Sequence, residues 1–311
     1  MKTLIICFSQ TNNTLKIAEC IRTGIIETTG QCDFTSLNDV DTKSLLEYDL
    51  VGLGSPVFYY REPFNVRDFI ESLPDLNGRH WFVFCTHGNV IGNFFPSVTD
   101  KLTAKNALVV GFHNSYANIT VPYYPRPSYT SGHPDSFDLE QARAFGREIA
   151  ERSPKIHNPD SPLIPPPGPV SSEGWIKDSF RLTQDVLRQV MPKLSHDTET
   201  CIQCHKCEEN CPVQGIDIET DPPRLQDPCI FCLRCVTVCP TASIEADWQP
   251  LLYMVPANYE RYKKELDKAT ARGEFRWLID PESINLDDPL YKQREREIKT
   301  KKTKGSSDKN P

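Results

Sequence analysis

Eight of the twelve cysteines fall into two short runs with the same spacing. The runs read CIQCHKCEENCP and CIFCLRCVTVCP, and each has the form C-x2-C-x2-C-x3-C-P. A cubic [4Fe–4S] cluster needs four thiolates from tightly turned backbone. In this pattern the first three cysteines of a run bind one cluster and the fourth binds the other. The predicted ligands are Cys201, Cys204, Cys207 and Cys239 for cluster 1, and Cys229, Cys232, Cys235 and Cys211 for cluster 2.

Zinc and disulfide bonds are the alternative uses of such cysteines. C-x2-C pairs also form Zn(Cys)4 sites, but zinc leaves the third cysteine of each run and the two Cys-Pro steps, at Pro212 and Pro240, unexplained. Structural disulfides need a secretory context, which the chain does not show. Residues 195–245 resemble the bacterial two-[4Fe–4S] ferredoxins, and the cysteines carry most of that resemblance.

The length and composition indicate a cytoplasmic protein of two domains. A chain of 311 residues is long enough for two cores. No apolar run approaches the roughly twenty residues that a membrane span requires. Residues 1–7 are apolar but lack a cleavage site, so we interpret them as a first strand and not as a signal peptide. The remaining thiols are expected to be free in a reducing compartment, and they are Cys7, Cys20, Cys32 and Cys85.

The net charge of −7 is unevenly distributed. Residues 195–247 are strongly acidic, which favours docking to the basic surface of a redox protein, although a merely solvated acidic face is the simpler alternative. Residues 292–311 are basic, and the almost purely polar segment 297–311 is expected to be a disordered tail. Nothing else in the chain indicates nucleic-acid binding.

The first half alternates strand-like and helix-like segments. This alternation predicts an α/β fold with an open, doubly wound parallel sheet. Ligands of such sheets bind beyond the carboxyl ends of the strands, where this chain has three unusual loops. The expected strands are 3–8, 33–37, 50–55, 81–86 and 107–112, and the expected helices are 14–28, 64–73, 94–102 and 139–152.

The loop after the first expected strand is suited to a phosphate. Backbone N–H groups and hydroxyls at a helix N-terminus bind a phosphate dianion, and the helix dipole assists. The alternative is an ordinary polar helix cap. The loop lacks the glycine patterns of dinucleotide-binding and P-loop proteins. Its residues are Ser9, Gln10, Thr11, Asn12, Asn13 and Thr14.

This loop resembles the flavodoxin phosphate loop, [ST]-x-T-G-N-T, at five of six positions. Asn12 replaces the usual glycine, and asparagine tolerates a left-handed backbone better than most residues. The resemblance implies an FMN-binding, flavodoxin-like sheet with strand order 2-1-3-4-5. It also implies that the loops after the third and fourth strands contact the isoalloxazine ring. The implied ring contacts are Ser55, Pro56, Val57, Phe58, Tyr59 and Tyr60 in one loop, and Thr86, His87, Gly88, Asn89, Gly92 and Asn93 in the other.

Alternatives remain for several of these side chains. An aromatic residue stacked on a flavin excludes water, but Tyr59 and Tyr60 would serve equally well in an interface or on the surface. His87 or Asn89 would hydrogen-bond the ring, whereas a lone histidine is more often structural. The Tyr- and Pro-rich segment 113–138 is a long loop, and its composition fits either a lid or a docking surface.

The chain as a whole resembles the flavodoxin–ferredoxin fusion family of anaerobic bacteria and archaea. The resemblance implies electron transfer between one FMN and two [4Fe–4S] clusters. Because the Pro-rich linker is long, a homodimer that pairs the flavin of one chain with a cluster of the other is one possible arrangement. The alternatives are an FMN-dependent reductase of a small substrate and an electron-delivery subunit of a larger reductase. The expected parts are 1–152 (FMN domain), 153–194 (Pro-rich linker and bridging helix), 195–247 (dicluster α+β ferredoxin domain), 248–296 (C-terminal wrapping segment) and 297–311 (tail).

Overall fold

The computed structural model describes residues 1–307, with side chains described as far as residue 300. Two compact units divide this range. Unit 1 contains residues 1–118 and 132–183. Unit 2 contains residues 119–131 and the described residues from 184 onward. Among the described residues, no helix has the length and the apolar character needed to cross a membrane.

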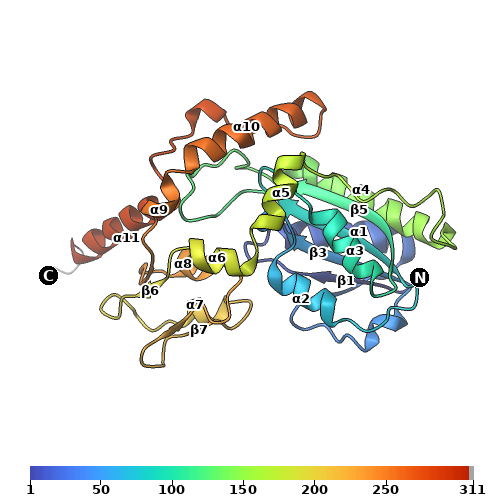
Figure 1. Cartoon of the computed structure of the whole chain (residues 1–311), viewed down its shortest axis with the longest axis horizontal. Coiled ribbons are helices and arrows are strands. Elements are labelled where there is room, and N and C mark those ends of the chain that lie inside the picture. The colour runs from blue at the N-terminus through green and yellow to red at the C-terminus, as the bar shows by residue number, and fades with distance from the viewer. Residues whose placement is uncertain (308–311) are drawn as a thin grey trace. The chain divides into compact units, whose positions relative to one another are not determined.

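Unit 1 is built on a five-stranded parallel sheet with the order β2-β1-β3-β4-β5, which is the predicted order (Figure 1). Every residue of the interior strand β1 is buried, as expected where helices cover both faces of a parallel sheet. The strands are β1 (Thr3–Cys7), β2 (Asp33–Ser36), β3 (Leu50–Pro56), β4 (His80–His87) and β5 (Leu108–Tyr116).

Helices α1 and α4 pack closely against each other over one face of this sheet. A Cβ at Gly24 of α1 would overlap the carbonyl oxygen of Arg143, and a Cβ at Gly146 of α4 would overlap that of Ile21. Glycine at both positions therefore permits the two backbones to approach. The elements of unit 1 outside the sheet are α1 (Asn13–Thr29), η1 (Ser44–Glu47), α2 (Phe64–Ser72), α3 (Phe94–Thr103), α4 (Ser136–Arg152), η2 (Ser153–Lys155) and α5 (Glu173–Arg181).

The core below α1 and α4 contains two of the four remaining cysteines. Cys7 and Cys32 lie among the buried side chains of this cluster. Burial raises the pKa of each thiol to about 12, so both stay neutral at physiological pH. Cys20 and Cys85 are also free thiols, which agrees with the prediction.

The bridging segment differs from its prediction. One bridging helix was expected within 153–194, but the structure has two helices there, α5 in unit 1 and α6 (Gln184–Val190) in unit 2. Trp175 is buried in unit 1 and Leu187 in unit 2, so the two ends are fixed by different cores. Phe180 of α5 is 63% exposed.

Unit 2 contains the two cysteine runs and two small antiparallel sheets, β6-β9 and β7-β8. Its last helix begins at Leu290 and continues to Ser307, so the stretch 297–307 is helical and not the disordered tail that was expected. Residues 308–311 of that tail lie outside the described residues. The elements are β6 (Ser195–His196), α7 (Lys206–Glu209), β7 (Ile216–Asp217), β8 (Arg224–Leu225), α8 (Arg234–Val238), β9 (Ile244–Glu245), α9 (Gln249–Leu252), α10 (Val255–Ala271), η3 (Pro281–Ser283) and α11 (Leu290–Ser307).

The segment 119–131 contributes tyrosines to the aromatic core of unit 2. The ring centroids of Tyr124 and Tyr259 lie 5.4 Å apart, and those of Tyr129 and Tyr259 lie 4.7 Å apart. The Tyr124 and Tyr262 hydroxyls are hydrogen-bonded at 3.1 Å. The part of the Tyr/Pro-rich loop at 119–131 therefore packs on α10, whose buried face includes Tyr259 and Tyr262.

Candidate functional site

The eight clustered cysteines line two separate cavities in unit 2. Cysteine cavity 1 and cysteine cavity 2 each contain four of them, and each set is the one that the spacing predicted. Cavity 1 is lined by Cys201, Cys204, Cys207 and Cys239, and cavity 2 by Cys211, Cys229, Cys232 and Cys235. Each cavity thus takes three cysteines from one run and the last cysteine from the other.

The backbone around the cavities repeats with a period of 28 residues. Left-handed residues occur at Gln203, His205 and Gln214, and again at their counterparts Phe231, Leu233 and Ala242. Such turns aim successive N–H groups toward one point. The N–H groups of Gln203 and Phe231 donate to the sulfur atoms of Cys201 and Cys229, at 3.4 and 3.2 Å. Those of Gly215 and Ser243 donate to Cys211 and Cys239, each at 3.1 Å.

These hydrogen bonds favour thiolates, whereas burial opposes them. Burial raises the pKa of Cys207 to about 11 and that of Cys229 to about 12. Burial also raises the pKa of Cys239, but hydrogen bonds from backbone groups and from Thr241 lower it. The pKa of Cys239 therefore lies below the usual value of a thiol. A bound metal deprotonates such thiols outright, so the donor set fits an iron–sulfur cluster in each cavity.

The phosphate-type loop has the expected backbone. Asn12 has φ 64°, so the left-handed conformation predicted for this glycine-like position is present. The N–H of Leu15 donates to the Ser9 hydroxyl at 3.3 Å. The buried Thr14 hydroxyl is 2.7 Å from that of Thr86, which ties the first loop to the end of β4. Thr11 and Asn13 lie between these anchors, at the start of α1.

The second and third loops are joined through Tyr60. The N–H of Asn93 donates to the Tyr60 carbonyl at 2.8 Å. Gly92 has φ 68°, and a Cβ there would overlap that same carbonyl. Tyr59 and Tyr60 are also left-handed, with φ 50° and 65°. The loop is closed by reciprocal backbone hydrogen bonds between Phe58 and Arg61.

A segment that sequence analysis did not assign to the site packs on this corner. The ring centroids of Trp175 and Tyr60 lie 4.9 Å apart. The N–H of Gly92 donates to the Ser171 hydroxyl at 2.8 Å, and the N–H of Ser171 donates to the Gly92 carbonyl at 3.1 Å. Residues 171–175, here called the strap, therefore fix both predicted flavin loops. The Pro-rich composition around the strap gave no signal of this contact.

Ser55, Pro56 and Val57 form the end of β3 and the start of the second loop. Ser55 is fully buried and its hydroxyl donates to the Pro56 carbonyl at 2.7 Å. The N–H of Val57 donates to the Thr86 carbonyl at 2.8 Å. Gly88 is half-buried between His87 and Asn89. These contacts align the ends of β3 and β4, the edge where a ligand of this sheet binds.

Three buried polar atoms in the first and third loops have no hydrogen-bond partner among the described residues. They are Nε2 of Gln10, Nδ1 of His87 and Oδ1 of Asn89. Buried polar atoms are normally paired, so this group fits a polar ligand such as FMN. Burial and the neighbouring His133 lower the pKa of His87 to about 3. His87 is therefore neutral at physiological pH.

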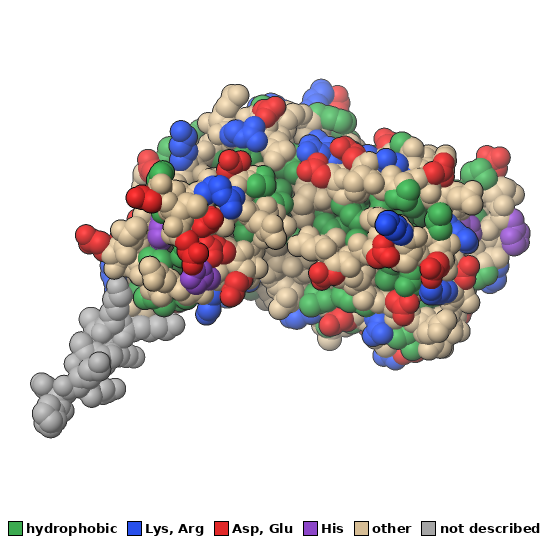
Figure 2. All heavy atoms as spheres, turned by 90° about the horizontal axis from the view of Figure 1, so that it is seen from below, with side chains coloured by type: hydrophobic (Ala, Val, Ile, Leu, Met, Phe, Trp, Pro, Cys, Tyr) green, Lys and Arg blue, Asp and Glu red, His purple; other side chains and the backbone are tan. Residues whose placement is uncertain are grey.

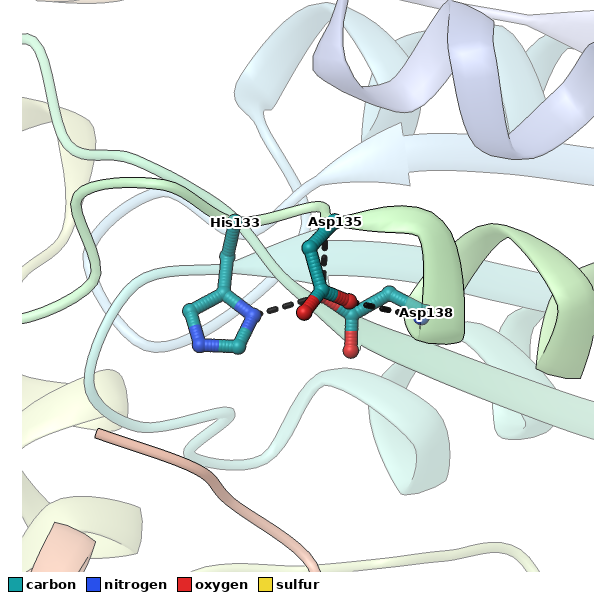
Figure 3. A group of neighbouring side chains, drawn as sticks. All are labelled: His133, Asp135 and Asp138. Atoms are coloured by element: carbon teal, nitrogen blue, oxygen red, sulfur yellow. Dashed lines mark hydrogen bonds and ion pairs between the residues drawn. The ribbon is translucent and has the colours of Figure 1, made fainter. Parts of the chain in front are cut away.

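A third group of metal-ligand types lies at the start of α4. His133, Asp135 and Asp138 place their ligand atoms within 4.8 Å of one another (Figure 3). Nδ1 of His133 is 2.5 Å from a carboxylate oxygen of Asp138. Asp135 and Asp138 form a reciprocal capping box with each other's backbone N–H groups. These contacts explain the group as a helix cap, which sequence analysis missed.

Comparisons with known protein families match one segment in each half of the chain. A flavodoxin domain family matches residues 4–93, and a 4Fe-4S dicluster domain family matches residues 193–240. The chain therefore combines a flavin-type and an iron–sulfur-type electron-transfer domain. It has the organisation of a flavodoxin–ferredoxin fusion. No curated protein matches it.

Several solved flavodoxins are similar to about half of the chain. One from the domain Archaea is 22% identical, covering 50% of this chain and 99% of its own, with a TM-score of 0.40. The Megasphaera elsdenii flavodoxin is 18% identical, covering 48% and 98%, with a TM-score of 0.38. Flavodoxin 2 from Bacillus cereus is 24% identical, covering 49% and 99%, with a TM-score of 0.38.

Proposed function

We propose that this protein transfers electrons between one FMN and two [4Fe–4S] clusters. The observation that carries the proposal is the division of eight cysteines into two cavities of four, in the crossed pattern that a dicluster ferredoxin requires. FMN accepts one or two electrons, whereas each cluster passes one. A chain with all three groups would connect a two-electron partner with a one-electron partner.

The residues of unit 1 would hold and shield the flavin. Ser9, Thr11 and the N–H groups at the start of α1 would bind the phosphate, assisted by the helix dipole. Tyr59 and Tyr60 would cover the ring and exclude water, and the strap holds Tyr60 in place. The neutral His87 and the unpaired Asn89 would offer hydrogen bonds without adding a charge.

The acidic face of unit 2 favours a basic redox partner. Ile202, beside the ligand Cys201, is 62% exposed. The exposed carboxylates Glu199, Glu209 and Glu219 belong to the same cysteine run and its flanks. Figure 2 shows acidic side chains gathered around a histidine on the iron–sulfur part of the molecule. An exposed apolar side chain next to a cluster ligand, in a run that also carries exposed acids, suits brief docking of a basic surface.

The cofactor content tests the proposal directly. The protein would be purified without oxygen, and iron, acid-labile sulfide, zinc and released flavin would be measured per chain. The expected result is about eight irons and about one FMN, with EPR signals of two interacting reduced clusters. About two zinc ions, or clusters without flavin, would contradict it.

A further inference from the structure

Arg294 of α11 contacts the end of α8, where the last cysteine of the second run lies. Its guanidinium donates hydrogen bonds to the carbonyl oxygens of Val236 and Cys239, with 2.5 Å between Nη2 and the Cys239 oxygen. The last carbonyls of a helix have no partner within that helix. Arg294 thus caps α8 and places a positive charge beside Cys239.

The guanidinium of Arg294 is partly buried. Burial lowers the pKa of Arg294, while the neighbouring Cys239 thiolate favours the charged guanidinium. An arginine keeps its proton at any physiological pH, so the cation is permanent. Cys239 is itself buried. A fixed cation therefore lies beside one wall of cysteine cavity 1.

Cysteine cavity 2 has an arginine of its own. Arg234, the first residue of α8, lines this cavity together with its four cysteines, and its charge interacts with Cys232. The Nε atom of Arg234 is buried and has no hydrogen-bond partner among the described residues. Nη2 lies 3.5 Å from the side-chain oxygen of Asn210. The Nε–H is therefore available to a sulfur atom in the cavity.

The 28-residue repeat explains why cavity 1 takes its cation from elsewhere. The counterpart of Arg234 in the first run is Lys206, which is exposed. The counterpart of Val236 is Glu208, whose carboxylate binds His205 at 2.6 Å and the N–H of Ile218 at 2.7 Å. The first run thus has an acid where the second has valine. Arg294 approaches Cys239, a residue that lines cavity 1, from outside the repeat.

We propose that Arg294 and Arg234 tune the two clusters separately, with Arg294 raising the reduction potential of cluster 1 and Arg234 that of cluster 2. The inference rests on the proposed function, because it requires both clusters. A nearby positive charge favours the cluster state that carries one more electron. A cation at each site would keep the two potentials close enough for electrons to pass in succession.

The test is an EPR-monitored redox titration of the full-length holoprotein. Arg294→Gln removes the charge but keeps a donor for the two carbonyls, and Arg234→Gln is its counterpart. Each single variant is expected to lower one midpoint potential and leave the other unchanged. At a fixed applied potential the reduced-to-oxidised ratio of that cluster should fall by about threefold or more. The double variant should lower both potentials and restore the original gap.

Two matched controls accompany these variants. Arg294→Lys keeps the charge and should retain the wild-type potentials. Arg296→Gln alters an exposed ion pair with Asp288 on the same helix and should change neither potential. Unchanged potentials in an Arg294→Gln protein with a full iron content would overturn the inference and leave the proposed function intact. If the difference between the two midpoint potentials grew in the double variant by the sum of the two single effects, both arginines would act on the same cluster. That result would also overturn the inference.

Iron and sulfide would be measured first on every protein. A wild-type chain without clusters contradicts the proposed function itself, so the two failures are distinguishable. If Arg294→Gln lost one cluster while Arg294→Lys kept both, the charge of Arg294 would be needed to hold that cluster and not to tune its potential. That result would overturn the tuning assignment for cluster 1.

Discussion

Trp175 packs on Tyr60 with their ring centroids 4.9 Å apart, so a residue of the strap holds an aromatic residue of the predicted flavin site. Tyr60 needs this support because its backbone is left-handed, with φ 65°, a strained conformation for a residue with a side chain. The strap also hydrogen-bonds Gly92 in the third loop through Ser171. One short segment therefore positions two of the three loops.

Replacing Trp175 with alanine should weaken FMN binding. Without the indole, Tyr60 would have to become ordered when FMN binds. If that ordering costs about 1.4 kcal/mol, the affinity for FMN falls about tenfold. The free energy of unfolding should also fall by about 3–5 kcal/mol, because the indole is buried. FMN titration by fluorescence measures the first effect. Phe180→Ala on the exposed side of α5 is the control, and equal losses in both variants would contradict the role of the strap.

Asn12 should tolerate glycine but not valine. Glycine adopts φ 64° without strain, whereas a β-branched residue there costs about 1–3 kcal/mol and would distort the loop. We expect Asn12→Val to weaken the binding of FMN but not of riboflavin, which lacks the phosphate. Equal weakening of both flavins would show that the loop does not bind the phosphate.

His87 should make the fold less stable in mild acid. Its folded-state pKa is about 3, below the value of about 6.5 expected when unfolded, so between these values the unfolded chain binds more protons. Stability from this residue is complete above about pH 6.5 and is lost as the pH falls toward 3, by at most about 1.4 kcal/mol per pH unit. Urea unfolding across this window should show a shallower slope for His87→Asn. An unchanged slope in His87→Asn would contradict this contribution of the buried imidazole.

The acidic face should govern reactions with charged electron acceptors. The reduced protein should reduce a cationic complex such as hexaamminecobalt(III) faster at low than at high salt, because screening weakens the attraction. The double variant Glu209→Lys and Glu219→Lys should lose most of that salt dependence. A neutral acceptor serves as the control. An unchanged salt dependence in the variant would exclude these carboxylates from docking.

The sheet and the cysteine sets were predictable because each depends on local sequence. The strands and helices of unit 1 were predicted largely within a few residues, except that β5 continues to Tyr116 instead of ending near 112. Polar residues such as His113 and Asn114 suggested a loop, yet they pair with Phe84 and Cys85 of β4. Pairing with a long neighbouring strand outweighed their low apolar character.

The strap and the arginine beside Cys239 were not predictable from one sequence. Trp175 and Tyr60 are in contact although more than a hundred residues separate them in the sequence. The residues around either one give no indication of this contact. Arg294 lay in the basic stretch 292–311, for which no specific contact was predicted. Such contacts depend on tertiary packing, which periodicity and spacing do not encode.

The tyrosines of segment 119–131 have a consequence for how such a fusion arises. If two genes were simply joined end to end, each product would keep its whole core within its own stretch of chain. Here the second unit takes Tyr124 and Tyr129 from inside the first. A free-standing ferredoxin substituted for residues 184–311 would leave these rings without partners. The second unit therefore does not have its whole core in one continuous stretch of chain, and exchanging residues 184–311 alone would not exchange that core.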